Sequence, residues 1–375
     1  MPLESAVSET RVAATPETVK KFLSLGCSIS IEKGAGIAAG FSDDSYSKAG
    51  AEIFETSDKK IWGECEIILC VQAPSEYCLS QVKNNCLLVG LLSPYSNTAL
   101  EKSLEDSPIT ALALELLPRI SRAQSADALS SQANIAGYKA VLIAASALDK
   151  YFPMLMTAAG TVQPAKIVVL GAGVAGLQAV ATARRLGAVV FVSDIRPAVK
   201  EQVESLGGRF INPPLIESSQ ESGGYAKESS EDFLKAQRKE LTKHLSEADV
   251  AICTAQVPGK TAPLLINEDM LSQMRPGSVV VDLAVAQGGN CSGSDPNKVI
   301  LRNGVKLIGA ADLPCTVPNH ASSLYSRNLL SLLEPFIQNG KLNINFEDEI
   351  IAGCLISHTR IINNNIDSTN QGEQK

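Results

Sequence analysis

The segment IVVLGAGVAG, residues 167–176, gives the clearest indication of the fold of this chain. Its first four residues are Ile, Val, Val and Leu, which is typical of a buried parallel strand. The mostly apolar residues that follow, up to Leu186, predict a helix. Three glycines between the two elements fit the pattern GxGxxG: Gly171, Gly173 and Gly176. The stretch therefore predicts a strand, a tight turn and a helix, as in a doubly wound α/β sheet.

Each glycine of this turn has a physical role in binding a dinucleotide. The first two permit the tight turn and the close approach of a pyrophosphate, and the third lets helix and strand pack. The helix N-terminus supplies N–H donors. Asp194 follows the next apolar run, where a carboxylate accepts hydrogen bonds from ribose hydroxyls and repels a 2′-phosphate, although Arg196 weakens that distinction. The pattern predicts NAD(H) rather than NADP(H), for chemistry or for regulation; the alternative is a glycine turn without a ligand.

Apolar runs elsewhere in the chain predict two α/β units. The second unit has strand candidates at residues 167–170, 189–192, 250–254, 278–282 and 305–310. The first has candidates at residues 28–32, 66–71, 86–91 and 109–113, separated by helical stretches or turns. We therefore expect two Rossmann-like, doubly wound domains.

Two predicted helices define how the domains connect. The Ala-rich stretch 124–148 predicts one long helix that bridges them, and the leucines of 322–336 predict a helix that folds back on the first domain. We expect a discontinuous first domain, a dinucleotide-binding domain and a disordered polar tail. Their expected bounds are 1–133 plus 321–350, 134–320, and 363–375.

Composition excludes several other classes of protein. The 375 residues carry a net charge of −7 without a block of Lys and Arg, so nucleic acid is not an expected partner. The nine cysteines are scattered and form no CxxC pair, which favours buried thiols in a reducing compartment. With three histidines, neither a zinc site nor a Ser/His/Asp triad is expected. The N-terminus shows no signal peptide pattern.

A second group of polar residues lies near the start of the predicted bridging helix. Gln124, Asp127 and Ser130 recur every three residues, so a helix would place them within about 120° of one face. Arg119 precedes them and could reach back over that face. Spacing alone also fits a solvated stripe with one surface ion pair.

Several segments resemble the NAD(H)-binding component (domain I, carried by the alpha subunit) of proton-translocating NAD(P) transhydrogenase, whose fold alanine dehydrogenase shares. These segments are Arg11-Val12-Ala13 with Thr15-Pro16, residues 118–137, 156–161, 223–227 and 257–260, and Asp282-Leu283-Ala284 with residues 288–291. The resemblance covers about residues 11–333. It implies direct hydride transfer from NADH to NADP⁺ on a partner subunit, coupled to proton translocation.

The resemblance also implies roles for individual residues. Those implied to be catalytic orient the nicotinamide or close a loop over it: Arg119, Gln124, Asp127, Ser130 and Tyr225. Those implied to contact NAD(H) are Gly171, Gly173, Val174, Ala175, Gly176, Asp194, Ile195, Arg196, Gly224, Thr254, Ala255 and Gln256. Gln256 departs from the apolar residue expected there. The family further implies a homodimer, membrane-spanning and NADP(H)-binding partner subunits, and a cytoplasmic place at the membrane surface. The three histidines and scattered cysteines predict no metal site.

Two rival functions stay open. An alanine dehydrogenase-like oxidoreductase would need a Lys, a His and an acid, and the corresponding positions hold Gln72, the segment 90–93 (Gly-Leu-Leu-Ser) and Ala286. Oxidative deamination needs such ionisable groups, whereas hydride transfer between two nicotinamide rings needs only alignment. The other rival is a non-catalytic NAD-sensing protein.

Two further polar residues have more than one interpretation. Asp282 ends a predicted strand and would orient either backbone N–H groups or the nucleotide. Lys260 follows Pro258-Gly259 and would either bind phosphate or remain a solvated loop lysine.

Overall fold

The computed structural model describes residues 1–55, 59–82, 85–105, 107, 109–212, 231–257 and 259–357. The chain divides into two compact units, Met1–Gln132 with Pro314–Lys375, and Ala133–Leu313. The expected second boundary, 320/321, falls inside helix α11 (Pro318–Leu333), which lies wholly in the first unit. The reason is that Pro318 opens this helix, so the chain enters the first unit before the leucines begin. The expected tail, 363–375, lies outside the described residues.

The second unit is built on a seven-stranded sheet in the order β10-β9-β8-β11-β12-β14-β13. The strands are β8 (Lys166–Leu170), β9 (Val189–Ser193), β10 (Arg209–Phe210), β11 (Val250–Cys253), β12 (Val279–Asp282), β13 (Val299–Arg302) and β14 (Val305–Gly309). All pair in parallel except β13, which runs antiparallel at the edge. The order reverses between β8 and β11, and such a switch point leaves a crevice at the carboxyl ends of the strands.

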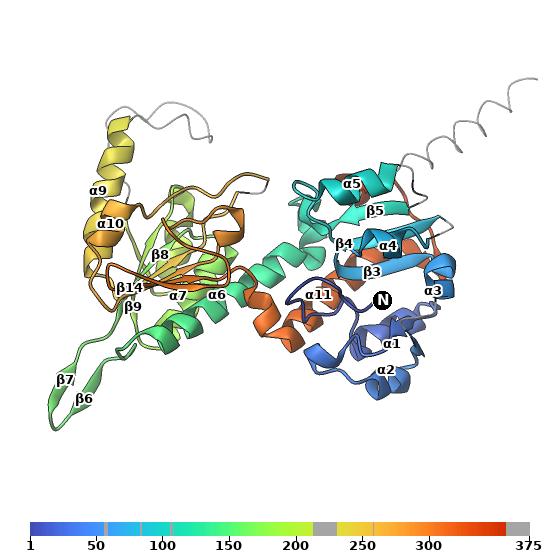
Figure 1. The fold of residues 1–375 in the computed structure, drawn as a ribbon, viewed down its shortest axis with the longest axis horizontal. Coiled ribbons are helices and arrows are strands. Elements are labelled where there is room, and N and C mark those ends of the chain that lie inside the picture. The colour runs from blue at the N-terminus through green and yellow to red at the C-terminus, as the bar shows by residue number, and fades with distance from the viewer. Residues whose placement is uncertain are drawn as a thin grey trace, which may run out of the picture. The chain divides into compact units, whose positions relative to one another are not determined.

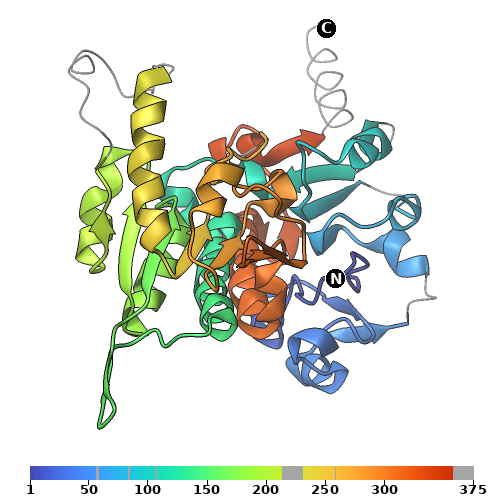
Figure 2. The same cartoon turned by 60° about the vertical axis from the view of Figure 1, so that its left-hand side comes forward.

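Helices cover both faces of this sheet (Figure 1). One face packs against α6 (Ala128–Ala147), α7 (Val174–Arg185) and α8 (Lys200–Ser205). The other packs against α9 (Glu231–Glu247) and α10 (Glu268–Ser272). A hairpin of β6 (Leu155–Thr157) and β7 (Gly160–Val162) projects from this unit (Figure 1; Figure 2). The arrangement confirms the expected doubly wound fold.

The first unit has a four-stranded sheet in the order β17-β5-β4-β3. Its strands are β3 (Ile67–Gln72), β4 (Cys86–Leu91), β5 (Ile109–Ala113) and the antiparallel β17 (Leu355–Ser357). Helix α11 and the short α12 (Glu349–Cys354) cover one face. On the other face lie α4 (Glu76–Leu79) and α5 (Thr98–Glu105). As predicted, a C-terminal helix folds back to cover this sheet, because β-branched and leucine side chains on the strand face need apolar partners.

A smaller cluster of the first unit surrounds a separate two-stranded sheet. Its elements are α1 (Pro16–Ser24), β1 (Ser30–Glu32), α2 (Asp43–Ala49) and β2 (Glu52–Phe54), and α3 (Lys59–Glu64) follows β2. Thr15 caps α1, with Pro16 at the first helical position. Short elements complete the two units: η1 (Ile37–Ala39), η2 (Leu114–Leu116), η3 (Ser121–Ala126), η4 (Pro197–Val199), η5 (Val285–Gln287), η6 (Leu313–Thr316), η7 (Glu334–Phe336), β15 (Ile337–Gln338) and β16 (Lys341–Leu342). Across the described part of the chain, no helix has the length and apolar character to cross a membrane.

The prediction of one helix over residues 124–148 is wrong at its start. Residues 121–126 form the 3₁₀ helix η3, and α6 begins only at Ala128. Asp127 separates them with a non-helical ψ of 86°. Its carboxylate accepts hydrogen bonds from the backbone N–H of Ser130 at 2.9 Å and from Ser130 Oγ at 2.5 Å, as an N-cap does. Gln124 therefore does not share an α-helical face with Asp127 and Ser130.

Candidate dinucleotide site

The GxGxxG turn lies between β8 and α7, and each of its glycines has a distinct environment. Gly171 has φ of +100°, a conformation that side chains disfavour. A Cβ at Gly176 would lie 1.9 Å from the carbonyl oxygen of Gly171. A Cβ at Gly173 would meet no atom within 4 Å. The first and third glycines therefore serve the turn and the packing, while the second leaves open space in front of the helix.

The N-terminus of α7 faces this space without a capping side chain. Gly173 is the N-cap residue and makes no side-chain hydrogen bond, and Val174 opens the helix. The first N–H groups of a helix have no intrahelical acceptor, and the helix dipole favours an anion beside them. Val174 is 41% exposed at this position. The backbone of residues 173–176 can thus cradle the pyrophosphate of a dinucleotide.

Asp194 lies at the end of β9, beside the turn. Its carboxylate accepts a hydrogen bond from the N–H of Ala172 at 2.7 Å and from the N–H of Arg196 at 2.8 Å. The guanidinium of Arg196 also bonds both carboxylate oxygens, at 3.0 and 3.1 Å. Burial favours a higher pKa for Asp194, but Arg196 and the Ala172 N–H outweigh it and lower the pKa. Asp194 is therefore an anion paired with the half-exposed Arg196 side chain beside the glycine turn.

The carboxyl end of β11 borders the same turn. Thr254 Oγ1 donates to the carbonyl oxygens of Leu170 and Gly171, at 3.1 and 3.0 Å, so it ties β11 to the glycine turn. The amide of Gln256 donates to the carbonyl oxygen of Leu283 at 2.8 Å. That contact accounts for a polar residue at a position where an apolar one was expected.

Asp282 and Asn290 hold the loops behind this edge of the sheet. Asp282 is fully buried and accepts hydrogen bonds from the N–H groups of Ala284, Asn290 and Cys291. Asn290, also fully buried, accepts from the N–H of Ala255 and donates to its carbonyl oxygen. Of the two interpretations of Asp282, the structure supports the orientation of backbone N–H groups. No separate signal marks Asn290 in the sequence beyond its place in the Gly-Gly-Asn-Cys segment.

The other predicted residues of this site are either exposed or outside the described residues. Ile195 is 71% exposed beside Asp194, and Lys260 is exposed on its loop. Gly224 and Tyr225 lie outside the described residues. The described portion of the site, residues 171–176, 194–196 and 254–256, brings together a glycine turn, an uncapped helix N-terminus and a carboxylate, the groups that a dinucleotide site needs.

The polar set implied for the nicotinamide belongs to the first unit. Arg119 and Gln124 are exposed, whereas Asp127 and Ser130 are half-buried and bonded to each other. Arg122, which lies between Arg119 and Gln124 in the sequence, forms a bidentate ion pair with Asp348 at 2.7 and 2.9 Å. Of the four implied residues, the structure therefore joins only Asp127 and Ser130 by a hydrogen bond.

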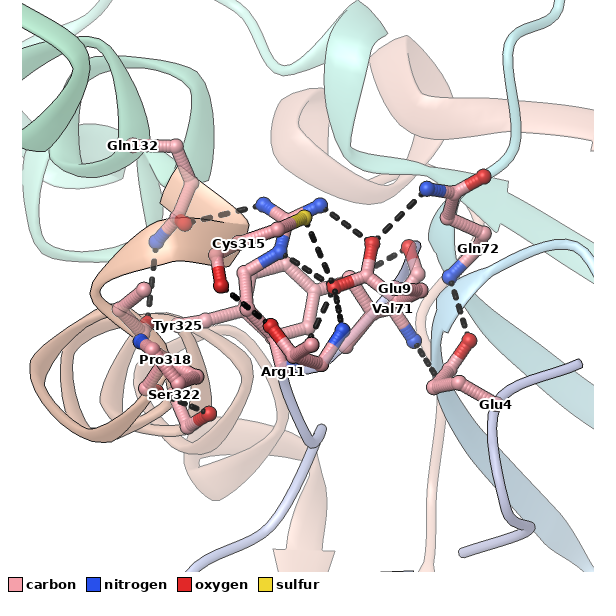
Figure 3. Close-up of polar contacts among 12 residues, drawn as sticks. Glu4, Glu9, Arg11, Val71, Gln72, Gln132, Cys315, Pro318, Ser322 and Tyr325 are labelled. Atoms are coloured by element: carbon pink, nitrogen blue, oxygen red, sulfur yellow. Dashed lines mark hydrogen bonds and ion pairs between the residues drawn. The ribbon is translucent and has the colours of Figure 1, made fainter. Parts of the chain in front are cut away.

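A buried polar cluster of the first unit, shown in Figure 3, was not predicted from the sequence. The guanidinium of Arg11 bonds both carboxylate oxygens of Glu9, at 2.8 and 2.6 Å, and Gln132 Oε1 at 3.0 Å. The amide of Gln72 donates to the same carboxylate at 2.8 Å. The Glu9 side chain is fully buried and that of Arg11 is 8% exposed. Burial favours a higher pKa for Glu9, but Arg11 outweighs it and lowers the pKa.

Glu4, at the edge of the same cluster, predicts a pH dependence of stability. Burial raises its pKa to about 7, although the N–H groups of Val71 and Gln72 donate to its carboxylate. Because the folded protein binds this proton more tightly than the unfolded chain, the stabilisation is complete below about pH 4.5 and is lost as the pH rises through about 7. Urea titrations give the free energy of unfolding, which should fall between pH 5 and pH 8 in the unmodified chain. In Glu4→Gln this fall should be smaller by up to about 3 kcal/mol. The control Glu101→Gln, at an exposed position, should show the same fall as the unmodified chain. A fall of that size in Glu4→Gln would contradict the raised pKa of Glu4.

Comparison with known proteins places the chain in a family. Its residues 1–136 match the model of the alanine dehydrogenase/PNT N-terminal domain, and residues 140–365 match that of the alanine dehydrogenase/PNT C-terminal domain. The chain is 45% identical over 368 residues to the first of the parts that make up the NAD(P) transhydrogenase subunit alpha of Rhodospirillum rubrum, and the match covers 95% of each chain.

Solved structures show the same relationship. The transhydrogenase from Sinorhizobium meliloti superposes with a TM-score of 0.86 and 42% identity, over 95% of this chain and 97% of that one. An L-alanine dehydrogenase superposes with a TM-score of 0.74 and 26% identity, over 96% of each chain. These comparisons confirm the resemblance found in the sequence. The chain belongs to the alanine dehydrogenase/PNT family, and within it groups with the alpha subunits of NAD(P) transhydrogenase.

Proposed function

We propose that this chain is the NAD(H)-binding component of a proton-translocating transhydrogenase, and that hydride passes directly between its NAD(H) and NADP(H) on a partner subunit. The observation that carries the proposal is the glycine turn 171–176 with the carboxylate of Asp194 beside it. The 45% identity to a transhydrogenase alpha subunit supports this role over that of an unrelated NAD-dependent protein.

The residues of the second unit would bind and orient the cofactor. Bound NADH would supply the hydride from its nicotinamide ring. The N–H groups at the start of α7 bind the pyrophosphate, and Asp194 accepts from the adenosine ribose. Ile195, exposed beside it, offers an apolar surface to the adenine, and the segment 254–256 borders the site at the end of β11. Hydride transfer between two rings requires alignment rather than an acid or base, which is what such a binding site provides.

The first unit contributes the implied orienting residues. On the family resemblance, Arg119, Gln124, Asp127 and Ser130 orient the nicotinamide, and Tyr225 closes a loop over the nucleotide. The hydrogen bonds between Asp127 and Ser130 support a fixed acceptor at the start of α6. The partners in this proposal are an NADP(H)-binding subunit, membrane-spanning subunits and a second copy of this chain, with the chain at the cytoplasmic surface of the membrane.

The structure argues against the amino-acid oxidoreductase. Gln72 carries no charge, and Ala286 has no carboxylate. Near Gln72 the cation is Arg11, and each of its guanidinium nitrogens is already bonded to Glu9 or Gln132. A substrate carboxylate would have to displace a buried carboxylate of this chain. Among these described residues, oxidative deamination therefore has neither an ionisable base nor a cation open to a substrate carboxylate.

Replacement of Asp194 tests the ribose contact. Asp194→Ala should weaken NADH binding about tenfold or more, because hydrogen bonds to a charged group contribute about 1.5–3 kcal/mol. Titration of NADH fluorescence measures the affinity, and urea unfolding of the same variant separates binding from the lost Ala172 contact. An unchanged affinity would remove Asp194 from the site.

Replacement of Arg119 tests the orienting residues. Arg119→Met should slow hydride transfer 10- to 100-fold at saturating NADH, since loss of alignment alone can cost about 100-fold. Stability should not change, because Arg119 is exposed. Arg122→Met, which removes the nearby ion pair with Asp348, is the matched control and should transfer hydride at the normal rate. Equal rates in both variants would contradict the role of Arg119.

The proposal itself is tested by mixing the chain with a transhydrogenase NADP(H)-binding component and following exchange between NADH and an oxidised NADP analogue. Alanine-dependent reduction of NAD⁺ serves as the parallel assay. Exchange that requires both proteins supports the proposal. NADH binding without exchange would favour the NAD-sensing protein instead.

A further inference from the structure

Two thiols of the first unit lie together at the amino ends of neighbouring strands. Cys65 lies just before β3, and Cys86 is the first residue of β4. Their Sγ atoms are 3.9 Å apart, within hydrogen-bond distance for sulfur. A disulfide bond is about 2.05 Å long, so the structure holds the pair as thiols. The expectation of buried cysteines is wrong for Cys27, Cys65 and Cys78, which are half-buried.

The two thiols differ in access. Cys86 is 3% exposed. It lies on the face of β4 that packs against the helices α4 and α5. Cys65 lines a cavity of about 590 Å³, together with Cys27 and Trp62. A small molecule in the cavity can therefore reach Cys65, while Cys86 is sheltered directly behind it.

The pKa shifts of the two thiols differ in the same sense as their access. The hydrogen bond from Cys86 lowers the pKa of the Cys65 thiol to about 7, against the effect of burial. The same contact, with burial, raises the pKa of Cys86, so its proton stays on that sulfur. Burial raises the pKa of Cys27, the other thiol of the cavity. Of the two paired thiols, Cys65 therefore loses its proton first and is the nucleophile.

We propose that Cys65 and Cys86 form a reversible disulfide on exposure to a hydroperoxide, with Cys65 as the attacking thiol and Cys86 as the resolving thiol. With hydrogen peroxide, the Cys65 thiolate attacks one oxygen, the O–O bond breaks, and the departing hydroxide takes up a proton to leave as water. Cys65 is then a sulfenic acid. The Cys86 sulfur attacks the Cys65 sulfur, the S–O bond breaks, and the hydroxyl group leaves as water with the Cys86 proton. The two thiols are oxidised by two electrons in total, and one peroxide is reduced to two waters.

The disulfide would have a mechanical consequence within the first unit. It would join the amino ends of β3 and β4 and close a loop that contains α4. Gln72 and its polar cluster are at the opposite, carboxyl end of β3. Oxidation should therefore stabilise the first unit without breaking that cluster. The inference does not depend on NAD(H) binding or hydride transfer.

Peptide mapping of the intact chain tests the pair. The protein is treated with hydrogen peroxide at pH 7, blocked with N-ethylmaleimide and digested without reduction. We expect one peptide pair joined through Cys65 and Cys86, which dithiothreitol separates. Cys27→Ser should give the same product. Cys86→Ser should instead leave a sulfenic acid on Cys65 that dimedone traps.

A rate measurement on the unmodified chain makes the test independent of how the variants fold. Before oxidation, Cys65 should react with N-ethylmaleimide at pH 7 at least about tenfold faster than Cys27. Recovery of Cys65 and Cys86 as separately alkylated thiols after peroxide treatment would overturn the proposal. So would a cross-link between Cys65 and Cys27, or a Cys65 that reacts no faster than Cys27.

Discussion

Gly176→Ala is expected to destabilise the second unit by about 3 kcal/mol or more, and to abolish NADH binding with it. A Cβ at this position would lie 1.9 Å from the carbonyl oxygen of Gly171 and 2.9 Å from its carbonyl carbon. Both are backbone atoms of the turn, so no flexible side chain can yield. Either α7 must move away from β8 or the turn must open. Overpacking typically costs about 1–3 kcal/mol, and a clash between two backbone segments lies at the upper end of that range.

Gly173→Ala, in the same turn, is the matched control. Its Cβ would meet no atom within 4 Å, and its φ of −78° suits any residue. Stability should therefore be unchanged, while NADH binds more weakly because a methyl group occupies the space in front of the α7 N-terminus. Urea unfolding and NADH titration of the two variants measure the difference. Equal stability losses in both, or a stable Gly176→Ala, would show that the turn packs differently.

Breaking the buried pair of Glu9 and Arg11 should have a similarly large effect on the first unit. Glu9→Gln removes the carboxylate charge and leaves the Arg11 guanidinium with neutral amide oxygens as acceptors, in surroundings where its side chain is 8% exposed. Arg11→Met leaves a fully buried carboxylate without its cation. Removing one partner of a buried ion pair typically costs about 3–5 kcal/mol.

The double variant separates this interaction from the two side chains themselves. Glu9→Gln with Arg11→Met leaves no unpaired charge, so its loss of stability should be at least about 2 kcal/mol smaller than the sum of the single losses. Urea unfolding gives the free energies, and hydrogen exchange assigns the transition to the first unit. Lys33→Met, which opens the exposed pair of Lys33 and Glu55, should change stability little. Strict additivity of the two buried substitutions would contradict a coupled pair.

The second unit could be predicted well from the sequence because its signals are local. Buried parallel strands appear as apolar runs, and the glycine turn needs Gly at fixed positions, so strands such as β8 and β12 could be located within a residue or so. The two missed strands of its seven-stranded sheet lack those signals. β10 has only two residues, and β13 runs along the sheet edge with Val299 and Leu301 about 70% exposed, so its side chains do not show a buried pattern.

The errors in the first unit come from contacts that periodicity does not encode. A spacing of three fits a helix through Gln124 and Asp127, but the side chain of Asp127 bonds Ser130 and so begins a new helix. The cluster around Glu9 joins residues far apart in the chain, including Gln72 and Gln132. Two charges two residues apart near the N-terminus carry no sign that they will be buried together.

Hydride exchange in a mixture of this chain and a transhydrogenase NADP(H)-binding component tests the proposed transfer between the two nucleotides. NADH and an oxidised NADP analogue are supplied together, and reduction of the analogue is followed with each protein alone and with both. We expect exchange only when both proteins are present. We also expect it to be lost when Asp194 is replaced and the NADH concentration is kept below the Kd of that variant. Absence of exchange while NADH is bound, or reduction of NAD⁺ that depends on alanine and needs no partner, would contradict the proposed transfer.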